Sequence, residues 1–111
     1  MAVTVKNIIP PKLAESAQTT QYTAVGVKCI VDKFTASNTS ASPVTLAVNL
    51  VTFAGTAGAL NLIVPAVSID PGTVYKFPEL IGQVMEASGF ISTLASASSA
   101  LTISASGREV S

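Results

Sequence analysis

The chain alternates apolar and polar residues with a period of two over most of its length, and this pattern is the strongest constraint on its fold. In PVTLAVNLV (43–51), every second residue is a large aliphatic one. Successive side chains of a β-strand point to opposite faces, so the pattern predicts a strand with one buried face. Similar segments occur at residues 2–9, 19–25, 27–36, 62–69, 73–77, 90–95 and 100–106.

Clusters of Pro, Gly, Ser and Asn separate these segments at the spacing of about 8–12 residues that is typical of all-β sandwiches and barrels. We therefore predict an all-β fold, a single-domain antiparallel β-sandwich of about seven to eight short strands over residues 1–111. Because Pro10-Pro11 interrupts the first strand and a polar stretch follows, residues 1–21 could form an N-terminal arm.

Helix chemistry is confined to one place, so we expect at most one short helical turn near residues 78–84. Pro78 suits the first position of a helix, and Leu80 and Val84 have i, i+4 spacing, but Gly82 weakens the segment.

The turn signals predict how some strands connect. The polar cluster at 37–42 predicts a β-hairpin between 27–36 and 43–51. Asp70-Pro71-Gly72 predicts a turn after which 73–77 returns along 62–69, where Pro65 requires an edge strand or a bulge. The expected core is Ile30, Phe34, Leu46, Val48, Leu50, Ile69, Phe77, Leu80, Leu101 and Ile103.

The residue types that usually carry catalysis are scarce, since the chain has no histidine and one cysteine. A Ser-His-Asp or Cys-His arrangement is excluded, and a zinc site would lack its usual ligands. Glu79 and Glu86 are expected to be two solvated carboxylates rather than a glycosidase-like pair. Residues 54–58 (AGTAG) lack the Gly-Lys-Ser/Thr ending of a phosphate loop and are interpreted as a flexible loop tip. We expect no catalytic, cofactor-binding or metal-binding residues and no enzymatic activity.

Four remaining side chains have chemistry worth placing. Cys29 is expected to be a small buried hydrophobe in a strand, and Tyr22 and Tyr75 to be strand residues at a core or interface rim. Asp32 shares the expected face of Ile30 and Phe34. It would need Lys28, Lys76 or Arg108 as a partner if buried, while the commoner alternative is an exposed cross-strand pair with a neighbouring lysine.

The charge content bears on partners. Six Lys and Arg balance six Asp and Glu, and the basic residues are spread along the whole chain, which argues against nucleic acid as a partner. No apolar run approaches the ~20 residues of a spanning helix, so we expect no membrane partner. A surface rich in Ser, Thr and Ala offers little repulsion between copies, which favours a homo-oligomer.

Two long segments, VKCIVDKFTASNTSASPVTLAVNLV (27–51) and SIDPGTVYKFPELIGQVMEASGFISTLASASSALTISASGREV (68–110), carry a family resemblance. They share a Thr/Asn/Ser turn, a Pro-Gly turn leading to an aromatic-Pro-Glu-Leu-Ile-Gly stretch, an Ile-Ser-Thr strand and a terminal Ala-Ser-Gly-Arg-Glu stretch. In these features the chain resembles small all-β virion structural proteins of tailed bacteriophages. The resemblance implies a β-sandwich that is assembled in the bacterial host cytoplasm and packs onto capsid, neck or tail subunits of the virion, with no catalytic residues.

Two functions from different classes remain open at this point. The first is a non-enzymatic virion protein that decorates or bridges other virion structural proteins. The alternative is a receptor- or carbohydrate-binding module on a tail fibre. Sugar sites usually place aromatic rings against the sugar, and a chain with two Tyr and no Trp is poorly equipped for that. We therefore do not expect carbohydrate as a partner.

Overall fold

The computed structural model describes residues 2–111 and contains strands with two short 3-10 turns, η1 (Ala59–Asn61) and η2 (Pro78–Leu80). The turn η2 lies where a helical turn was expected, and η1 was not predicted. The strands are β1 (Val3–Leu13), β2 (Thr19–Thr23), β3 (Lys28–Asn38), β4 (Val44–Val51), β5 (Leu62–Ile69), β6 (Val74–Tyr75), β7 (Val84–Met85), β8 (Phe90–Ala95) and β9 (Leu101–Val110).

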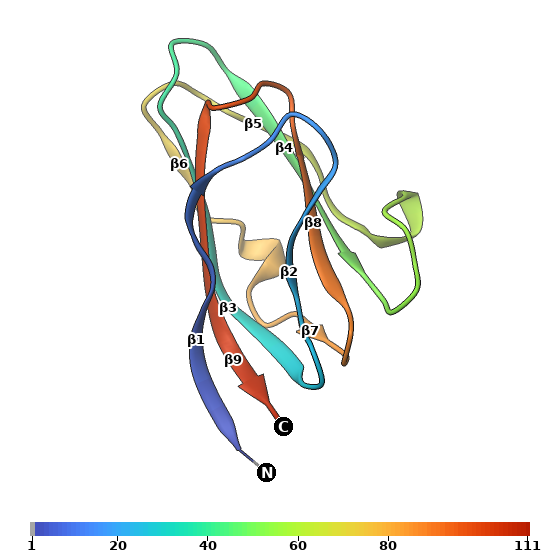
Figure 1. Ribbon diagram of the computed structural model, residues 1–111. Coiled ribbons are helices and arrows are strands. Elements are labelled where there is room, and N and C mark those ends of the chain that lie inside the picture. Colours follow the sequence, from blue (N-terminus) through green and yellow to red (C-terminus); the bar gives the residue numbers. More distant parts are fainter. Residues whose placement is uncertain (1) are drawn as a thin grey trace.

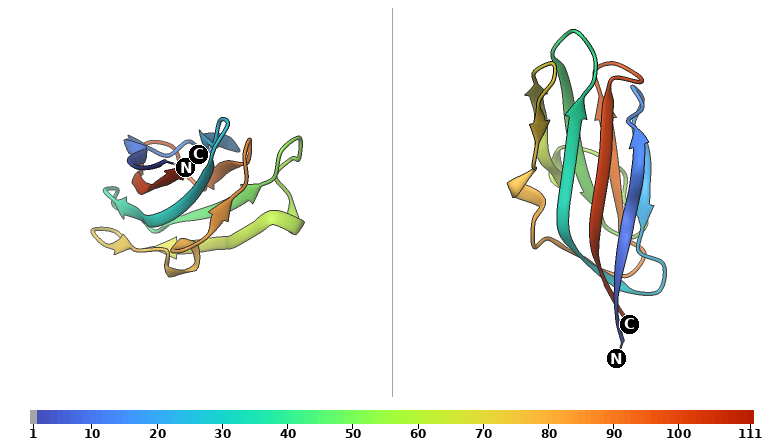
Figure 2. Two further views of the ribbon diagram at one scale, coloured as in Figure 1. Left: turned by 90° about the horizontal axis from the view of Figure 1, so that it is seen from below. Right: turned by 90° about the vertical axis from the view of Figure 1, so that its left-hand side faces the viewer.

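The strands form two antiparallel sheets that pack face to face (Figure 1, Figure 2). The first sheet has the order β1-β9-β3-β6, with β7 also paired to β3, and the second has the order β2-β8-β4-β5. The predicted all-β sandwich is confirmed. The strand that the sequence did not predict is β7, which is only two residues long.

Consecutive strands mostly lie in opposite sheets, so the predicted hairpin between residues 27–36 and 43–51 is wrong. β3 belongs to the first sheet and β4 to the second, and the polar cluster between them crosses from one sheet to the other. The Asp70-Pro71-Gly72 turn crosses in the same way, because β6 pairs with β3 and not with β5. The only consecutive strands paired within the described chain are β4 and β5.

Asn38 explains how the β3–β4 crossing is held. Its buried side-chain amide donates to the backbone oxygens of Ser42 and Ile69, each at 2.8 Å, and its Oδ1 accepts from the Ser40 backbone N–H at 2.9 Å. A hairpin turn satisfies its own backbone groups. In this connection between sheets, the side chain of Asn38 supplies hydrogen bonds to the backbone groups instead.

We expect Asn38→Ala to lower the free energy of unfolding by about 1–3 kcal/mol, because the buried Ile69 carbonyl and the partly exposed Ser42 carbonyl lose their donor. Asn38→Asp is the matched variant: it keeps the size and the acceptor but cannot donate, so it should be destabilised as well. Urea unfolding followed by circular dichroism measures both. Wild-type stability in both variants would contradict this role.

Pro10 and Pro11 interrupt the pairing of β1 without ending the strand. The β1–β9 register shifts between Lys6 and Ile9 and again between Ile9 and Lys12, so the second irregularity contains both prolines. A bulge on an edge strand tolerates proline because no ladder hydrogen bond is lost there. As a result, the segment considered as an arm contributes β1 to the first sheet and β2 to the second. Pro65 follows the same rule on the edge strand β5, within the register shift between Leu46 and Val48 of β4.

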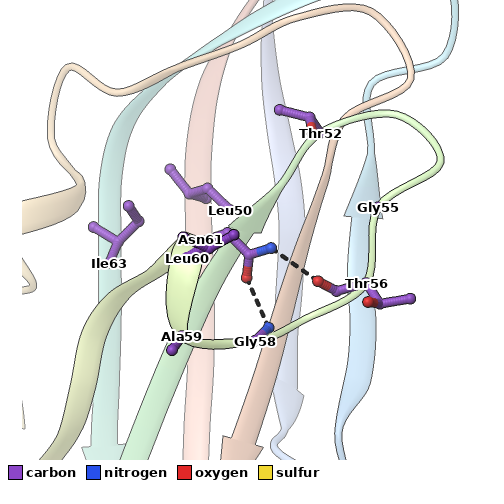
Figure 3. Close-up of a pocket in the computed structure, with 9 residues that line it drawn as sticks. All are labelled: Leu50, Thr52, Gly55, Thr56, Gly58, Ala59, Leu60, Asn61 and Ile63. Carbon is purple, nitrogen blue, oxygen red and sulfur yellow. Dashed lines mark hydrogen bonds between the residues drawn. The ribbon is translucent and has the colours of Figure 1, made fainter.

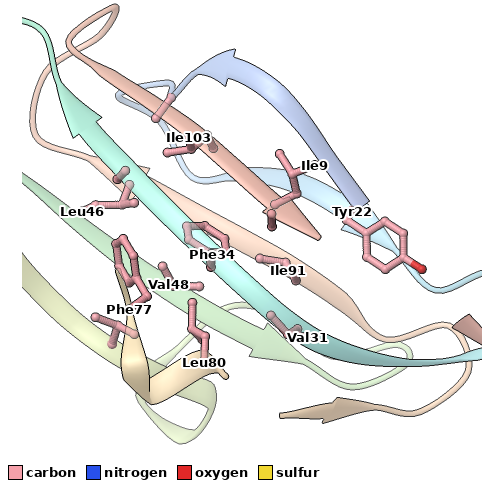
Figure 4. Close-up of a cluster of buried hydrophobic side chains, with 14 of the residues drawn as sticks. Ile9, Tyr22, Val31, Phe34, Leu46, Val48, Phe77, Leu80, Ile91 and Ile103 are labelled. Atoms are coloured by element: carbon pink, nitrogen blue, oxygen red, sulfur yellow. The ribbon is translucent and has the colours of Figure 1, made fainter. Parts of the chain in front are cut away.

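The core lies between the sheets and is centred on Phe34, Phe77, Leu46 and Leu80 (Figure 4). Eight of the ten expected core residues are buried, and the exceptions are Ile30 and Leu50. Leu50 has the predicted inward orientation opposite Ile91 of β8, but it is only partly buried.

Ile30 differs because β3 contains a bulge. Val31 lies opposite Gly107 and Lys33 opposite Ser106 on β9, so Asp32 is the extra residue. One added residue exchanges the two faces of a strand. Phe34 therefore points into the core beyond the bulge, whereas before it Cys29 and Val31 point inward and Ile30 points outward. The predicted common face of Ile30, Asp32 and Phe34 is thus wrong.

Candidate interaction surface

The outer face of the first sheet carries a row of side chains that crosses four strands. Val5 of β1 lies opposite Arg108 of β9, Arg108 lies opposite Ile30 of β3, and Ile30 lies opposite Val84 of β7. Residues directly opposite each other in antiparallel strands project from the same face. We call Val5, Arg108, Ile30 and Val84 the valine row.

The valine row and the residues beside it are unusually apolar for an exposed surface. Val5 is 81% exposed and Val84 is 51% exposed, and Val3, in the next row, is 56% exposed. That next row continues through Val110 to Lys28, which pairs with Glu86 at 3.5 Å. Large aliphatic side chains thus lie on both sides of Arg108 on this sheet surface.

The charge within the valine row is neutralised locally. Arg108 donates from Nε to both carboxylate oxygens of Asp32, at 3.2 and 3.0 Å, and from a terminal nitrogen at 2.9 Å. The Asp32 carboxylate raises the pKa of Arg108 above its ordinary value. Both side chains are exposed, at 44% for Arg108 and 39% for Asp32. The exposed alternative for Asp32 is therefore confirmed, with arginine in place of the expected lysine.

A second polar group lies between the sheets, at the end where β1 and β9 project. Tyr22 of β2 donates its hydroxyl hydrogen bond to Glu109 of β9, and Lys6 of β1 donates to the same carboxylate at 3.3 Å. These bonds lower the pKa of Glu109, that of Tyr22 being the larger cause, while burial and then Glu109 raise the pKa of Tyr22. Both groups therefore keep their ordinary charge states at neutral pH, and the contact ties the two sheets together.

Cys29 is buried next to this group, as expected for a structural cysteine. Burial raises the pKa of its thiol, which opposes formation of the reactive thiolate. Tyr22 is buried at the rim of the core, and Tyr75 is partly buried on β6, so both are strand residues as predicted.

The two glutamates considered as a catalytic pair have separate partners. Glu79, in η2, accepts hydrogen bonds from the Tyr75 hydroxyl at 2.8 and 3.1 Å. Glu86 follows β7 and pairs with Lys28. Because η2 ends at Leu80, no helix face joins the two carboxylates.

The loop between β4 and β5 contains a hollow of about 610 Å³, bordered by Leu50, Ile63 and Leu60 (Figure 3). Asn61 organises it: its side chain accepts from the Gly58 backbone N–H at 3.0 Å and donates to the Thr56 backbone oxygen at 2.9 Å. Asn49 on β4 adds a bond to the Gly58 oxygen at 3.1 Å. The segment interpreted as a flexible glycine loop is therefore internally bonded. None of the nine lining residues is aromatic.

Within residues 2–111 there is no group of three or more Cys, Asp or Glu side chains placed to hold a metal ion. No helix in this part of the chain is long and apolar enough to cross a membrane. Comparison with protein-family models, with curated proteins and with solved structures finds no significant match to the chain.

Proposed function

We propose that this protein is a non-enzymatic structural component of a tailed-bacteriophage virion, an accessory subunit that decorates or bridges capsid, neck or tail subunits. The observation that carries the proposal is the valine row, a sheet surface spanning four strands on which aliphatic side chains flank one ion-paired arginine. Contiguous apolar surface of this kind typically marks a protein–protein contact, whereas isolated exposed aliphatic residues are ordinary.

The electrostatics of the same surface suit a contact repeated in many symmetric copies. Arg108 is paired with Asp32 and Lys28 with Glu86, so the charges in and beside the valine row are balanced within one subunit, and Lys33 further along β3 is the exposed cation on this face without an ion pair among the described residues. A partner that covers the valine row needs to supply no compensating charge there, and the centres of interfaces are generally depleted of unpaired charge. The chain as a whole has formal net charge zero, which adds no long-range repulsion between copies.

The resemblance of residues 27–51 and 68–110 to small phage virion proteins supplies the class of partner. On this proposal the protein is made in the bacterial host cytoplasm and works as part of the virion. The rival receptor-binding role has less support, because the hollow at the β4–β5 loop has no aromatic lining for a sugar ring.

The test is incorporation into virions purified from the cells that produce this protein. Quantitative mass spectrometry should find a fixed number of copies of the wild-type protein in each virion. A particle reconstruction should place these copies at symmetry-related positions. Val84→Lys places a charge in the valine row, so we expect at least a tenfold loss of incorporation.

Leu60→Lys is the matched control, since Leu60 is fully exposed on the β4–β5 loop of the second sheet, and it should incorporate normally. Circular dichroism should give the same spectrum for both variants. Absence of the protein from purified virions would overturn the structural role. Equal incorporation of the two variants would overturn the assignment of the contact to the valine row.

A further inference from the structure

The backbone of β1 has an unpaired edge. Within residues 2–111, β1 pairs with β9 alone. Ala2 and Ser111 exchange two backbone hydrogen bonds, at 3.2 and 2.9 Å. Along antiparallel strands, hydrogen-bonded pairs like Ala2–Ser111 alternate with pairs that share no hydrogen bond. Thr4 therefore also turns its backbone N–H and C=O toward β9, whereas Val3 and Val5 turn theirs away from it. The N–H and C=O groups of Val3 and Val5 therefore face the open edge.

The first residues of β1 also extend past the rest of the sandwich. Figure 1 and the right-hand view of Figure 2 show the ends of β1 and β9 projecting together beyond the other strands. Residues 2–6 are all exposed, including those that alternate toward the inner face. An approaching strand would meet no obstruction from the second sheet here.

The other strands at the edges of the two sheets are protected, and this segment is not. β6 and β7 are two residues long, β5 contains Pro65 in a bulge, and β2 has an irregularity within its five residues. Short edges, prolines and bulges are the usual devices against edge-to-edge pairing. In β1 those devices begin only after Lys6, so residues 2–5 (AVTV) have no charge, proline or bulge.

We propose that this edge pairs with the same edge of a second copy of the chain, antiparallel and about a two-fold axis at Thr4. The inference rests on the proposed structural role and specifies one of its contacts. Val3 then lies opposite Val5 of the second copy as a hydrogen-bonded pair, and Val5 opposite Val3. The two first sheets become one continuous sheet.

The second copy fits because the edge is complementary to itself. The two residues with free backbone groups meet under one two-fold operation, which is the geometry of an isologous dimer. Valine opposite valine is a favourable cross-strand pair. Lys6 falls opposite Ala2 of the second copy, so the two lysines do not oppose each other. The valine row of one copy then continues into Val3 and Val110 of the other.

The first test is the mass of the purified chain in solution. Sedimentation equilibrium should give twice the 11.2 kDa chain mass for the wild type. Val5→Pro removes an outward N–H without breaking a bond to β9, and it should weaken dimerisation at least tenfold while the circular dichroism spectrum is kept. Val5→Thr is the control: it keeps the N–H and the β-branched shape, and it should remain dimeric.

The second test reads the register directly. The two-fold axis places residue 4 of each copy in a closely spaced, non-hydrogen-bonded pair, so Thr4→Cys should form a disulfide-linked dimer under mild oxidation. Lys12→Cys, on the same strand beyond the bulges, should not. The wild type, whose Cys29 is buried, should also remain unlinked.

A wild-type chain that is monomeric at all concentrations would overturn the inference, as would a Val5→Pro variant with wild-type mass. If the chain is monomeric and Val5→Pro is lost from virions while Val5→Thr is retained, the backbone N–H rather than the valine side chain is needed; the edge then binds a strand of another protein and the second-copy assignment is wrong. These outcomes are separate from that of Val84→Lys, which lies on β7 and tests the virion contact without altering β1.

Discussion

Replacing Phe34 with alanine is expected to lower the free energy of unfolding by about 3–5 kcal/mol, the range for deleting a buried aromatic ring. Phe34 is fully buried, and its ring meets Phe77 edge-to-face with centroids 4.9 Å apart. Phe77 in turn packs against Tyr75 at 4.7 Å. Removing Phe34 therefore leaves a cavity beside an aromatic cluster that joins β3 to the segment between β6 and η2.

The backbone adds to this expected loss. Phe77 has φ +44° and ψ +62°, in the left-handed region that a bulky residue rarely adopts. Such a conformation persists only when its surroundings determine it, and here the contact with Phe34 is one of those determinants.

Urea unfolding measures the effect, with Phe53→Ala as the matched control. Phe53 is 73% exposed, so its truncation should change stability by no more than about 0.5 kcal/mol. Loss of the near-ultraviolet circular dichroism of the aromatic cluster should accompany Phe34→Ala alone. Equal stability of the two variants would show that Phe34 does not pack in the core.

The positions of the strands could be predicted because alternation is a local property. In residues 44–48, for example, buried side chains alternate with outward-facing ones, and the sequence shows this alternation directly. The prediction failed at Asp32 because a single bulged residue reverses the faces of β3, and the bulge depends on what β9 presents opposite it. No residue near Asp32 in the sequence carries that information.

Strand partners were harder to predict than strands. The 37–42 cluster has the composition of a hairpin turn, but the same residue types also suit a crossing between sheets. The difference is made by Asn38, whose amide reaches the Ile69 carbonyl from 31 residues away. A turn signal therefore locates a reversal of the chain without specifying the sheet that it enters.

The candidate surface was beyond sequence reasoning for the same reason. Val5 and Arg108 are separated by almost the whole chain, and their adjacency follows only from the β1–β9 register. The sequence did indicate that Asp32 would have an oppositely charged partner, and Arg108 was among the partners considered. What it could not indicate was that the pair would lie within an exposed row of aliphatic side chains.

Gly107 provides the second large expected effect, because two neighbouring strands leave no room for a side chain there. It lies in β9 opposite Lys6 of β1 and Val31 of β3. A Cβ at this position would lie 2.4 Å from the backbone oxygen of Ile30 and 3.4 Å from its carbonyl carbon. A flexible side chain could rotate away from such a contact, but a backbone carbonyl within a paired strand cannot.

We therefore expect Gly107→Ala to lower the free energy of unfolding by about 3 kcal/mol, at the upper end of the usual cost of overpacking. Strand propensity alone predicts the opposite sign, since glycine weakens a strand interior. Gly58→Ala is the control, because a Cβ there meets nothing within 4 Å, and its φ of −169° is open to any residue. Urea unfolding of the two variants separates these effects. A Gly107→Ala protein as stable as Gly58→Ala would mean that the Ile30 carbonyl does not lie as close to residue 107 as this packing requires.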